Sequence, residues 1–415
     1  MIRHAVAPAL VAAFTLSVWC APAQAQLIGP VPPGSNVRVP GDTAREPSVR
    51  APFTLTPTLT IAEEYNDNVL VDNKQKQSDF ITFITPGVAL TAESTRYRLL
   101  AAYSFRADLY AKDTSLNEAF NRHYFLTDGL YRVTPAFTLT LSEVFFFSTD
   151  TNLVAAEGVA TGRSKSFSNS FTPGMTYQFD RLNSLRVLAN STILRYQSGS
   201  AFDSDTYRFE PAFDHIFSSR LTGTLGYKFG YFDLKELGTA TAHTPLVGAA
   251  YRITETLTGT LSGGPTFVHE TRLDESRVTP AVTASLTQRL PFGLAALVYD
   301  RAIGTAGGFG GVTDNTSIGG VLRVTTLLKN LTVEFLPRYH TQISSDNSID
   351  VRGWTVPLRV AYQFNRYVAA VGGYQFFRQR ASGTLVNVVN SGLGNDVDQN
   401  RVSIGLQFGY PIDIQ

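Results

Sequence analysis

Residues 96–112 read RYRLLAAYSFRADLYAK, and the side chains alternate between two kinds. One face carries only apolar and aromatic residues, namely Tyr97, Leu99, Ala101, Tyr103, Phe105, Ala107, Leu109 and Ala111. The other face carries the charges, on Arg96, Arg98, Arg106, Asp108 and Lys112. A period of two indicates a β-strand, because successive side chains of a strand point to opposite faces. At about 3.3 Å per residue, such a strand can cross a bilayer even when it is steeply tilted.

The same alternation recurs across residues 53–411. Eight short connections, such as 134–135, alternate along the chain with nine long ones, such as 149–164 and 381–397. An even number of antiparallel strands with short turns at one end and long loops at the other is typical of bacterial outer-membrane barrels. The sequence therefore predicts an all-β fold, a transmembrane antiparallel β-barrel of 18 strands with both termini in the periplasm. Sixteen strands is the next count to consider.

Two segments fit the alternation less well. Residues 137–148 and 294–303 carry apolar side chains on both faces, which indicates a β-bulge or a register slip within them. A soluble β-sandwich is the main alternative fold, and its strands would be shorter, with turns every 8 to 12 residues or so.

Composition agrees with a wall that is apolar outside and polar inside. The chain has 18 Tyr, 28 Phe and 33 Gly in 415 residues, and no apolar run after residue 25 is long enough for a spanning helix. Outward aromatic residues such as Trp354 are expected in girdles at the membrane interfaces. The formal net charge of +1 gives no sign of a nucleic-acid partner.

The two ends of the chain predict export and a linker. Residues 1–25 have a short basic start, an apolar run and a small-x-small site at Ala23-Gln24-Ala25, the pattern of a cleaved signal peptide. A lipid-modified Cys20 is the alternative, but Trp19 fits that cleavage site poorly. Because Cys20 is the only cysteine, cleavage leaves no disulfide or thiolate metal site. Residues 26–52 are predicted to be a Pro/Gly-rich periplasmic linker, and 412–415 a C-terminal tail.

The last predicted strand ends on aromatic residues. Phe408 and Tyr410 share its apolar face, which resembles the C-terminal targeting strand that the barrel-assembly machinery recognises in outer-membrane proteins. Five residues follow Tyr410, whereas that signal usually ends on an aromatic residue. This strand must pair with the first one if the barrel closes.

A motif follows the first predicted strand. Glu64, Tyr65, Asn66, Asp67 and Asn68 spell EYNDN, which resembles the N-terminal signature of a family of outer-membrane β-barrel porins that includes barrels from exopolysaccharide export operons. The resemblance implies a porin-like barrel and a link to polysaccharide export components. From the residues alone, Asn-Asp-Asn favours a tight turn, and calcium binding by its oxygens is the alternative.

Turning the apolar face toward lipid fixes the residues expected to line the lumen. The expected basic set is Arg96, Arg98, Arg106, Lys112, Arg186, Arg208, Arg220, Lys228, Arg277, Arg338, Arg352, Arg359 and Arg401. The expected acidic set is Asp108, Glu210, Asp214 and Glu334. A basic excess of this size favours anions, because charges in a narrow channel are weakly screened. The alternative is that many of these bases pair with acids across the lumen or sit at the strand ends.

The sequence thus favours a channel that passes small anionic or sugar-like solutes, with no cofactor and no metal. An exopolysaccharide-linked barrel is one alternative. Another is a structural barrel closed by inward folding of the loops 149–164 and 381–397. An enzyme is not expected, since the five histidines after residue 25 are scattered and none sits in a hydrolase motif. The expected partners are outer-membrane lipid, lipopolysaccharide and the barrel-assembly machinery.

Overall fold

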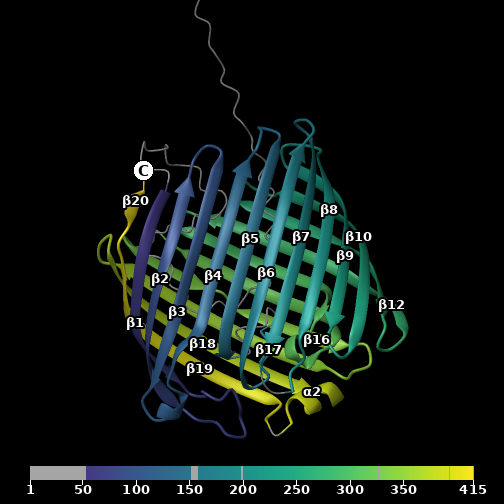
Figure 1. The fold of residues 1–415 in the computed structure, drawn as a ribbon. Helices are drawn as coiled ribbons and strands as arrows, with labels where there is room; N and C mark the ends of the chain where they lie inside the picture. The colour runs from purple at the N-terminus through teal and green to yellow at the C-terminus, as the bar shows by residue number, and fades with distance from the viewer. Residues whose placement is uncertain (1–52, 151–157, 198–199, 326–327, 392, 415) are drawn as a thin grey trace, which may run out of the picture.

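The computed structural model describes residues 53–150, 158–197, 200–325, 328–391 and 393–414. The predictions for 1–25 and 26–52 lie outside these residues. The described chain forms one closed antiparallel sheet (Figure 1). Its strands are β1 (Phe53–Asn66), β2 (Asp79–Glu93), β3 (Tyr97–Tyr110), β4 (Glu118–Arg132), β5 (Phe137–Asp150), β6 (Arg163–Gln178), β7 (Asn183–Tyr196), β8 (Ser204–Ile216), β9 (Leu221–Leu234), β10 (Gly238–Arg252), β11 (Leu257–Glu270), β12 (Glu275–Leu290), β13 (Gly293–Thr305), β14 (Val312–Val324), β15 (Leu331–Phe335), β16 (Arg338–Ser344), β17 (Asp350–Gln363), β18 (Val368–Ser382), β19 (Asp396–Gly409) and β20 (Ile412–Ile414).

These 20 strands make 18 crossings, where a crossing is one passage of the chain from one end of the barrel to the other. Two of the crossings are each interrupted once and so consist of two strands. β15 and β16 both pair with β14 on one side and β17 on the other, so they are one crossing broken at Leu336 and Pro337. Pro337 has no backbone N–H to give to the ladder. β19 and β20 both pair with β1 and are separated at Tyr410 and Pro411. The prediction of an 18-strand barrel is confirmed.

The barrel closes where the first crossing meets the last. β1 pairs with β2 along its whole length and with β19 from Thr58↔Gly409 to Asn66↔Arg401. β20 extends this seam to Phe53↔Ile414. Within the predicted C-terminal tail 412–415, residues 412–414 thus form a strand that extends the pairing of β1. Closure leaves no exposed sheet edge, which a membrane requires.

The two ends of the barrel differ. Short turns occupy one end, where Phe53 and Ile414 also lie, and longer loops occupy the other (Figure 1). The loops carry two 3-10 turns, η1 (Thr114–Leu116) and η2 (Gly307–Phe309), and the helix α2 (Thr384–Val389). No helix in the described ranges is long and apolar enough to cross a membrane.

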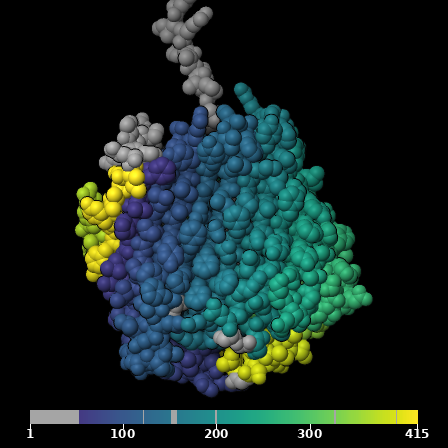
Figure 2. Space-filling model, viewed as in Figure 1, coloured from purple at the N-terminus to yellow at the C-terminus, as the bar shows by residue number. Residues whose placement is uncertain are grey.

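The wall has an apolar outside and a more polar inside. Leu225 and Ile404 are 68% and 72% exposed and point outward, whereas the inward Ser403 is buried. Outward Trp354 is 48% exposed. On the face shown in Figure 2, the side chains of neighbouring strands cover the wall, and the yellow residues of the β18–β19 loop lie at the long-loop end.

Two β-bulges shift the register near the long-loop end. One lies between Arg106 and Asp108 in the β3–β4 pair, and the other between Ser148 and Asp150 in the β5–β6 pair. The second adjoins the segment 137–148, whose mixed faces predicted an irregularity. The first irregularity adds two residues to β4, and the second adds one residue to β6 and so changes which side chain of β6 faces inward beyond it.

Candidate functional site: the lumen and its loops

The lumen is more open at the short-turn end than at the long-loop end. Arg98 and Arg106 both face inward from β3, but 41% of the Arg98 side chain is exposed and only 8% of the Arg106 side chain. Arg98 lies near the short turns and Arg106 near the loops. Solvent therefore reaches the inner wall at one end, and protein fills the space at the other.

A buried network of charges lies at the filled end. Arg401 on β19 donates to Glu64 on β1, with Nη2 2.8 Å from Oε1, and its Nη1 lies 3.3 Å from Asp150 Oδ2 on β5. Arg122 on β4 donates to the same Asp150 oxygen at 2.5 Å. Arg106 also lies 3.6 Å from Glu64 Oε2. These contacts join strands on both sides of the barrel seam, where β1 pairs with β19.

The network contains four arginines and three carboxylates. Arg163 on β6 approaches Asp150 at 3.7 Å, and Arg106 also contacts Asp108, which leaves one more positive than negative charge. Burying charges is costly unless each is paired, so the mutual contacts are what make this arrangement tolerable. Arg122 Nε and Nη1 and Arg106 Nη2 have no hydrogen-bond partner in the described part of the chain. Surplus donors and a surplus positive charge favour anions here.

Acidic partners neutralise most of the other expected lumen bases. Arg98 lies 3.4 Å from Asp128, Arg186 3.5 Å from Asp214 and Lys228 3.8 Å from Glu210. Further along the wall the pairs are Arg277 with Asp314 at 2.7 Å, Arg359 with Glu334 at 4.0 Å, and Arg323 with Glu334 at 2.6 Å. Arg208 lies over the Phe232 ring at 5.9 Å, and Arg338 points inward on β16. The bases are thus mostly held in ion pairs.

Four members of the expected basic set do not line the wall of the lumen. Arg352 faces outward with Trp354, is 58% exposed and pairs with Asp350 at 3.0 Å. Arg96 and Arg220 lie in exposed short turns, and Lys112 follows β3, where its Nζ donates to Ser78 O. The expectation for Arg352 is wrong, because Arg352 lies two residues from the outward Trp354 and therefore on the same face of β17.

Sequence reasoning also missed inward charges. Arg122, Arg163, Arg323, Asp128 and Asp150 all contact lumen residues. The expected excess of thirteen bases over four acids is therefore too large. Of the missed charges, Arg163 lies beyond the bulge in β6, where simple alternation no longer gives the face. Arg122 and Asp150 keep the alternation of the inward Asp128 and Ser148, so a count along β4 and β5 could have placed them inward. Asp128 lies on the opposite face of β4 from the outward Gly129 and Tyr131. Alternation along the whole of β4 therefore predicts that Asp128 faces inward.

A segment of the β5–β6 loop lies across the barrel interior. Ala160, in the β5–β6 loop, donates its N–H to Gln379 Oε1 at 2.8 Å and accepts from Gln379 Nε2 at 2.8 Å. Gln379 faces inward from β18 and is fully buried. The described part of 149–164 thus folds inward and is fixed to a strand far from its own ends.

Several loops meet in one apolar cluster, here called the loop plug. It consists of Val159, Ala306, Phe309, Ile349, Val351, Ala381, Val386 and Val389, with Ala201, Phe202 and Leu385 packed against them. Four of the loops and helix α2 contribute to it. Predicted inward folding of 381–397 is seen in Val386 and Val389, both buried. The plug narrows the long-loop end of the lumen.

The EYNDN motif fastens the barrel seam. Asn66 Oδ1 accepts from Asn68 N at 2.9 Å, which makes a tight turn, and Asn68 Nδ2 donates to Asp398 O at 2.9 Å. Asp67 accepts from the backbone and side chain of Asn400 at 2.7 and 2.8 Å. The motif therefore ties the end of β1 to the start of β19. Across the described residues no cluster of three or more His, Cys, Asp or Glu is suited to a metal ion.

Fold and lumen together define the class: an antiparallel β-barrel of the transmembrane type, closed and apolar outside. No protein-family model matches the chain, and no curated sequence matches it.

Solved outer-membrane structures are similar to it over most of its length. They include OccAB4 of Acinetobacter baumannii, with 10% identity, a TM-score of 0.42 and coverage of 88% of this chain and 100% of that one. Pseudomonas aeruginosa OpdO has 13% identity, a TM-score of 0.43 and coverage of 87% and 97%. Pseudomonas aeruginosa OpdK, solved with vanillate, has 10% identity, a TM-score of 0.42 and coverage of 86% and 99%. Similarity at this level assigns no function.

Proposed function

We propose that this protein is a porin-like channel in the outer membrane of a Gram-negative bacterium, through which small solutes pass passively. The observation that carries the proposal is the closed 18-crossing barrel with an apolar outer wall and a charged lumen. Such a wall is stable only in lipid, and such a lumen is stable only with water or polar solutes inside. The predicted signal peptide at 1–25 supports export to that membrane.

The channel is narrow at its long-loop end. The loop plug and the Ala160–Gln379 contact place protein across that end, so passage is limited to small molecules. We place the long loops outside the cell and the termini in the periplasm, as the connection lengths favour.

Anion preference is the selectivity that the lumen favours, and it is modest. Most wall bases are paired, but the buried network has one surplus positive charge and unpaired arginine donors. A charge at a constriction has the largest effect on ion passage. The preferred solutes are therefore small anions or sugars that carry a carboxylate.

Planar-bilayer recordings of the purified protein test both parts of the proposal. We expect small, steady conductance steps, and a reversal potential under a KCl gradient with the sign of chloride preference. A clear cation preference would overturn the selectivity and leave the channel intact.

A second candidate is a structural barrel closed by its own loops, which the buried loop plug favours. A correctly folded protein that gave neither conductance nor uptake of small sugars into vesicles would support this candidate and exclude the channel.

The exopolysaccharide link rests on the resemblance at Glu64–Asn68 alone and stays a prediction. Polysaccharide synthesis genes beside this gene would support it. Lipopolysaccharide around the outer wall and the barrel-assembly machinery during insertion are the partners we propose on the same grounds.

A further inference from the structure

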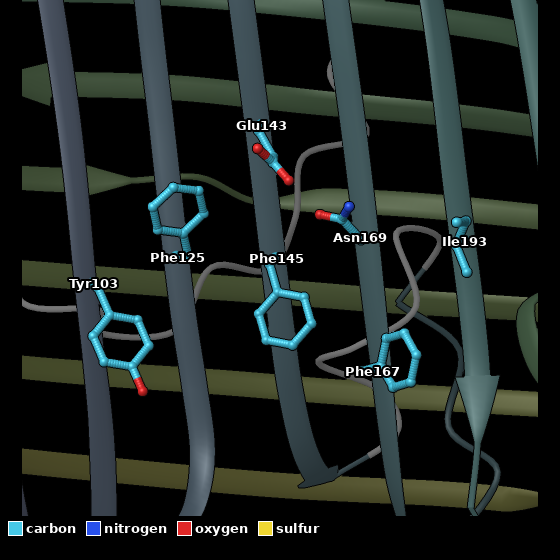
Figure 3. A pocket seen from close by; sticks show the side chains of 7 residues that line it. All are labelled: Tyr103, Phe125, Glu143, Phe145, Phe167, Asn169 and Ile193. Carbon is cyan, nitrogen blue, oxygen red and sulfur yellow. The ribbon is translucent and has the colours of Figure 1, made fainter.

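A hollow of about 460 Å³ lies on the outer wall, across strands β3 to β7 (Figure 3). Its frame is aromatic and includes Phe125, Phe145 and Phe167. Two polar side chains line one edge of the hollow, Glu143 on β5 and Asn169 on β6, above the rings of Phe145 and Phe167 in this view, and they point toward one another. A carboxyl group in an aromatic hollow on a lipid-facing wall needs a physical explanation.

The strand registers place both groups on the outer face. Glu143 is the cross-strand partner of Phe171, and Asn169 is the partner of Phe145. Phe171 is 38% exposed, and Leu139, on the same face of β5 as Glu143, is 40% exposed. Glu143 lies halfway along β5 (Phe137–Asp150), so its height in the bilayer is close to the middle.

Neither polar group is satisfied within one copy of the barrel. Glu143 makes no hydrogen bond or ion pair with any described residue, and Asn169 Oδ1 is buried without a partner. Polar groups that face hydrocarbon are costly, and lipid tails offer them no donors. Lipid headgroups do not reach the bilayer centre, so a compensating group at this depth has to come from protein.

We propose that the hollow is the interface with a second copy of this chain in the membrane. Copies inserted in the same direction are related by a two-fold axis along the membrane normal. An axis that passes beside the hollow brings Glu143 and Asn169 of one copy next to the same two residues of the other copy. The amide can donate to the partner's carboxylate, and the symmetry makes two such bonds.

The neighbouring outward residues suit close approach. Ser191 on β7 pairs with Phe171, and Thr127 on β4 pairs with Glu143. Small and hydroxylated residues at a contact between membrane proteins let the surfaces approach closely and add hydrogen bonds. The aromatic rings beside the polar pair offer the second copy an apolar contact surface next to these hydrogen bonds.

Cysteine cross-linking in intact outer membranes tests the proposal. Leu141→Cys, on the outward face of β5 beside Glu143, is treated with a short bis-maleimide in a Cys20→Ser background. We expect a product of twice the chain mass. Leu297→Cys, 57% exposed on β13 far around the barrel, is the matched control and should give none.

The polar pair is tested in the same assay. Glu143→Leu combined with Asn169→Leu should lower the cross-linked fraction about tenfold, because two membrane hydrogen bonds of about 0.6 kcal/mol each are lost. Glu143→Gln should retain the product, since the amide still bonds to Asn169. The heat-dependent shift of the barrel on gels confirms folding of each variant. A product with another protein's mass, equal products from both cysteine sites, or no effect of the double substitution would overturn the proposal.

Discussion

At the scale of single residues, the buried charge network joins strands on both sides of the barrel seam. Arg401 contacts Glu64 and Asp150, and all three side chains are at most 3% exposed. Removing one partner of a buried pair costs more than the pair itself contributes, because the remaining charge stays buried.

Arg401→Met is therefore expected to lower the free energy of unfolding by about 3 kcal/mol, measured by urea unfolding in lipid vesicles. Arg352→Met is the matched control, since its pair with Asp350 is exposed, and it should change the free energy of unfolding much less than Arg401→Met. Equal losses in the two variants would show that burial of the network adds nothing.

A second residue-scale prediction concerns acid stability of the β16–β17 loop. Burial alone raises the pKa of Asp346, but hydrogen bonds from Ser348, Ser344 and Arg272 outweigh burial and hold its pKa well below the ordinary value. The hydroxyl donors lie 2.7 Å from Oδ1. A lowered folded-state pKa stabilises the fold above the unfolded pKa of about 3.9, and this stabilisation is lost as the pH falls toward the folded value.

The melting temperature of Asp346→Asn should thus be lower than that of the wild type by a constant amount between about pH 5 and 7. The difference should shrink as the pH falls below about 4, because the Asp346 carboxyl of the unfolded chain becomes protonated there while the folded carboxylate stays charged to lower pH. Melting curves across this pH range provide the measurement, and a difference that does not change with pH would contradict the assignment.

At the scale of elements, one side chain, Gln379, hydrogen-bonds the β5–β6 loop to β18. Gln379 makes both described bonds to Ala160, so Gln379→Ala leaves a buried backbone N–H and C=O without partners. We expect a loss of about 1–3 kcal/mol in stability and a larger, noisier conductance as the loop leaves the lumen.

Gln375→Ala is the control for this substitution. Gln375 faces inward from the same strand, but its Nε2 has no hydrogen-bond partner in the described structure. Single-channel recordings of Gln379→Ala should differ from those of the wild type, and recordings of Gln375→Ala should not. An unchanged conductance in Gln379→Ala would mean that this loop does not limit passage.

At the scale of the whole molecule, the loop plug decides between an open channel and a closed barrel. Phe309 is fully buried in the plug, and its removal leaves a cavity among four loops. Phe309→Ala should cost about 3–5 kcal/mol if the plug is packed as a protein core is. It should also increase uptake of small sugars into vesicles.

Phe267→Ala is the comparison for the plug variant. Phe267 is 51% exposed on the outer wall, so its truncation removes contacts with lipid and leaves the lumen unchanged. We expect vesicles with Phe267→Ala to take up small sugars as fast as vesicles with the wild type. Equal uptake by the Phe309 variant and the wild type would favour a barrel whose loops stay closed.

Much of this architecture could be read from local sequence. Alternation along 96–112 predicts a strand, and β3 is observed at Tyr97–Tyr110. The same period repeated along the chain, with two kinds of connection, predicts 18 crossings and an apolar outer wall. These features depend only on the pleat of a strand and on neighbours in the chain, so they need no knowledge of distant contacts.

The tertiary structure alone decided what fills the barrel. Ala160 and Gln379 are 219 residues apart in the chain, and Glu64 and Arg401 are 337 apart, so no local pattern relates them. The bulge before Arg163 changes the inward face of β6 by one residue, which alternation cannot follow. The sequence by itself determined the wall, because the wall is periodic. Pairing of the inward charges, the loop plug and the isolated Glu143 were decided by closure, because closure brings distant strands and loops together.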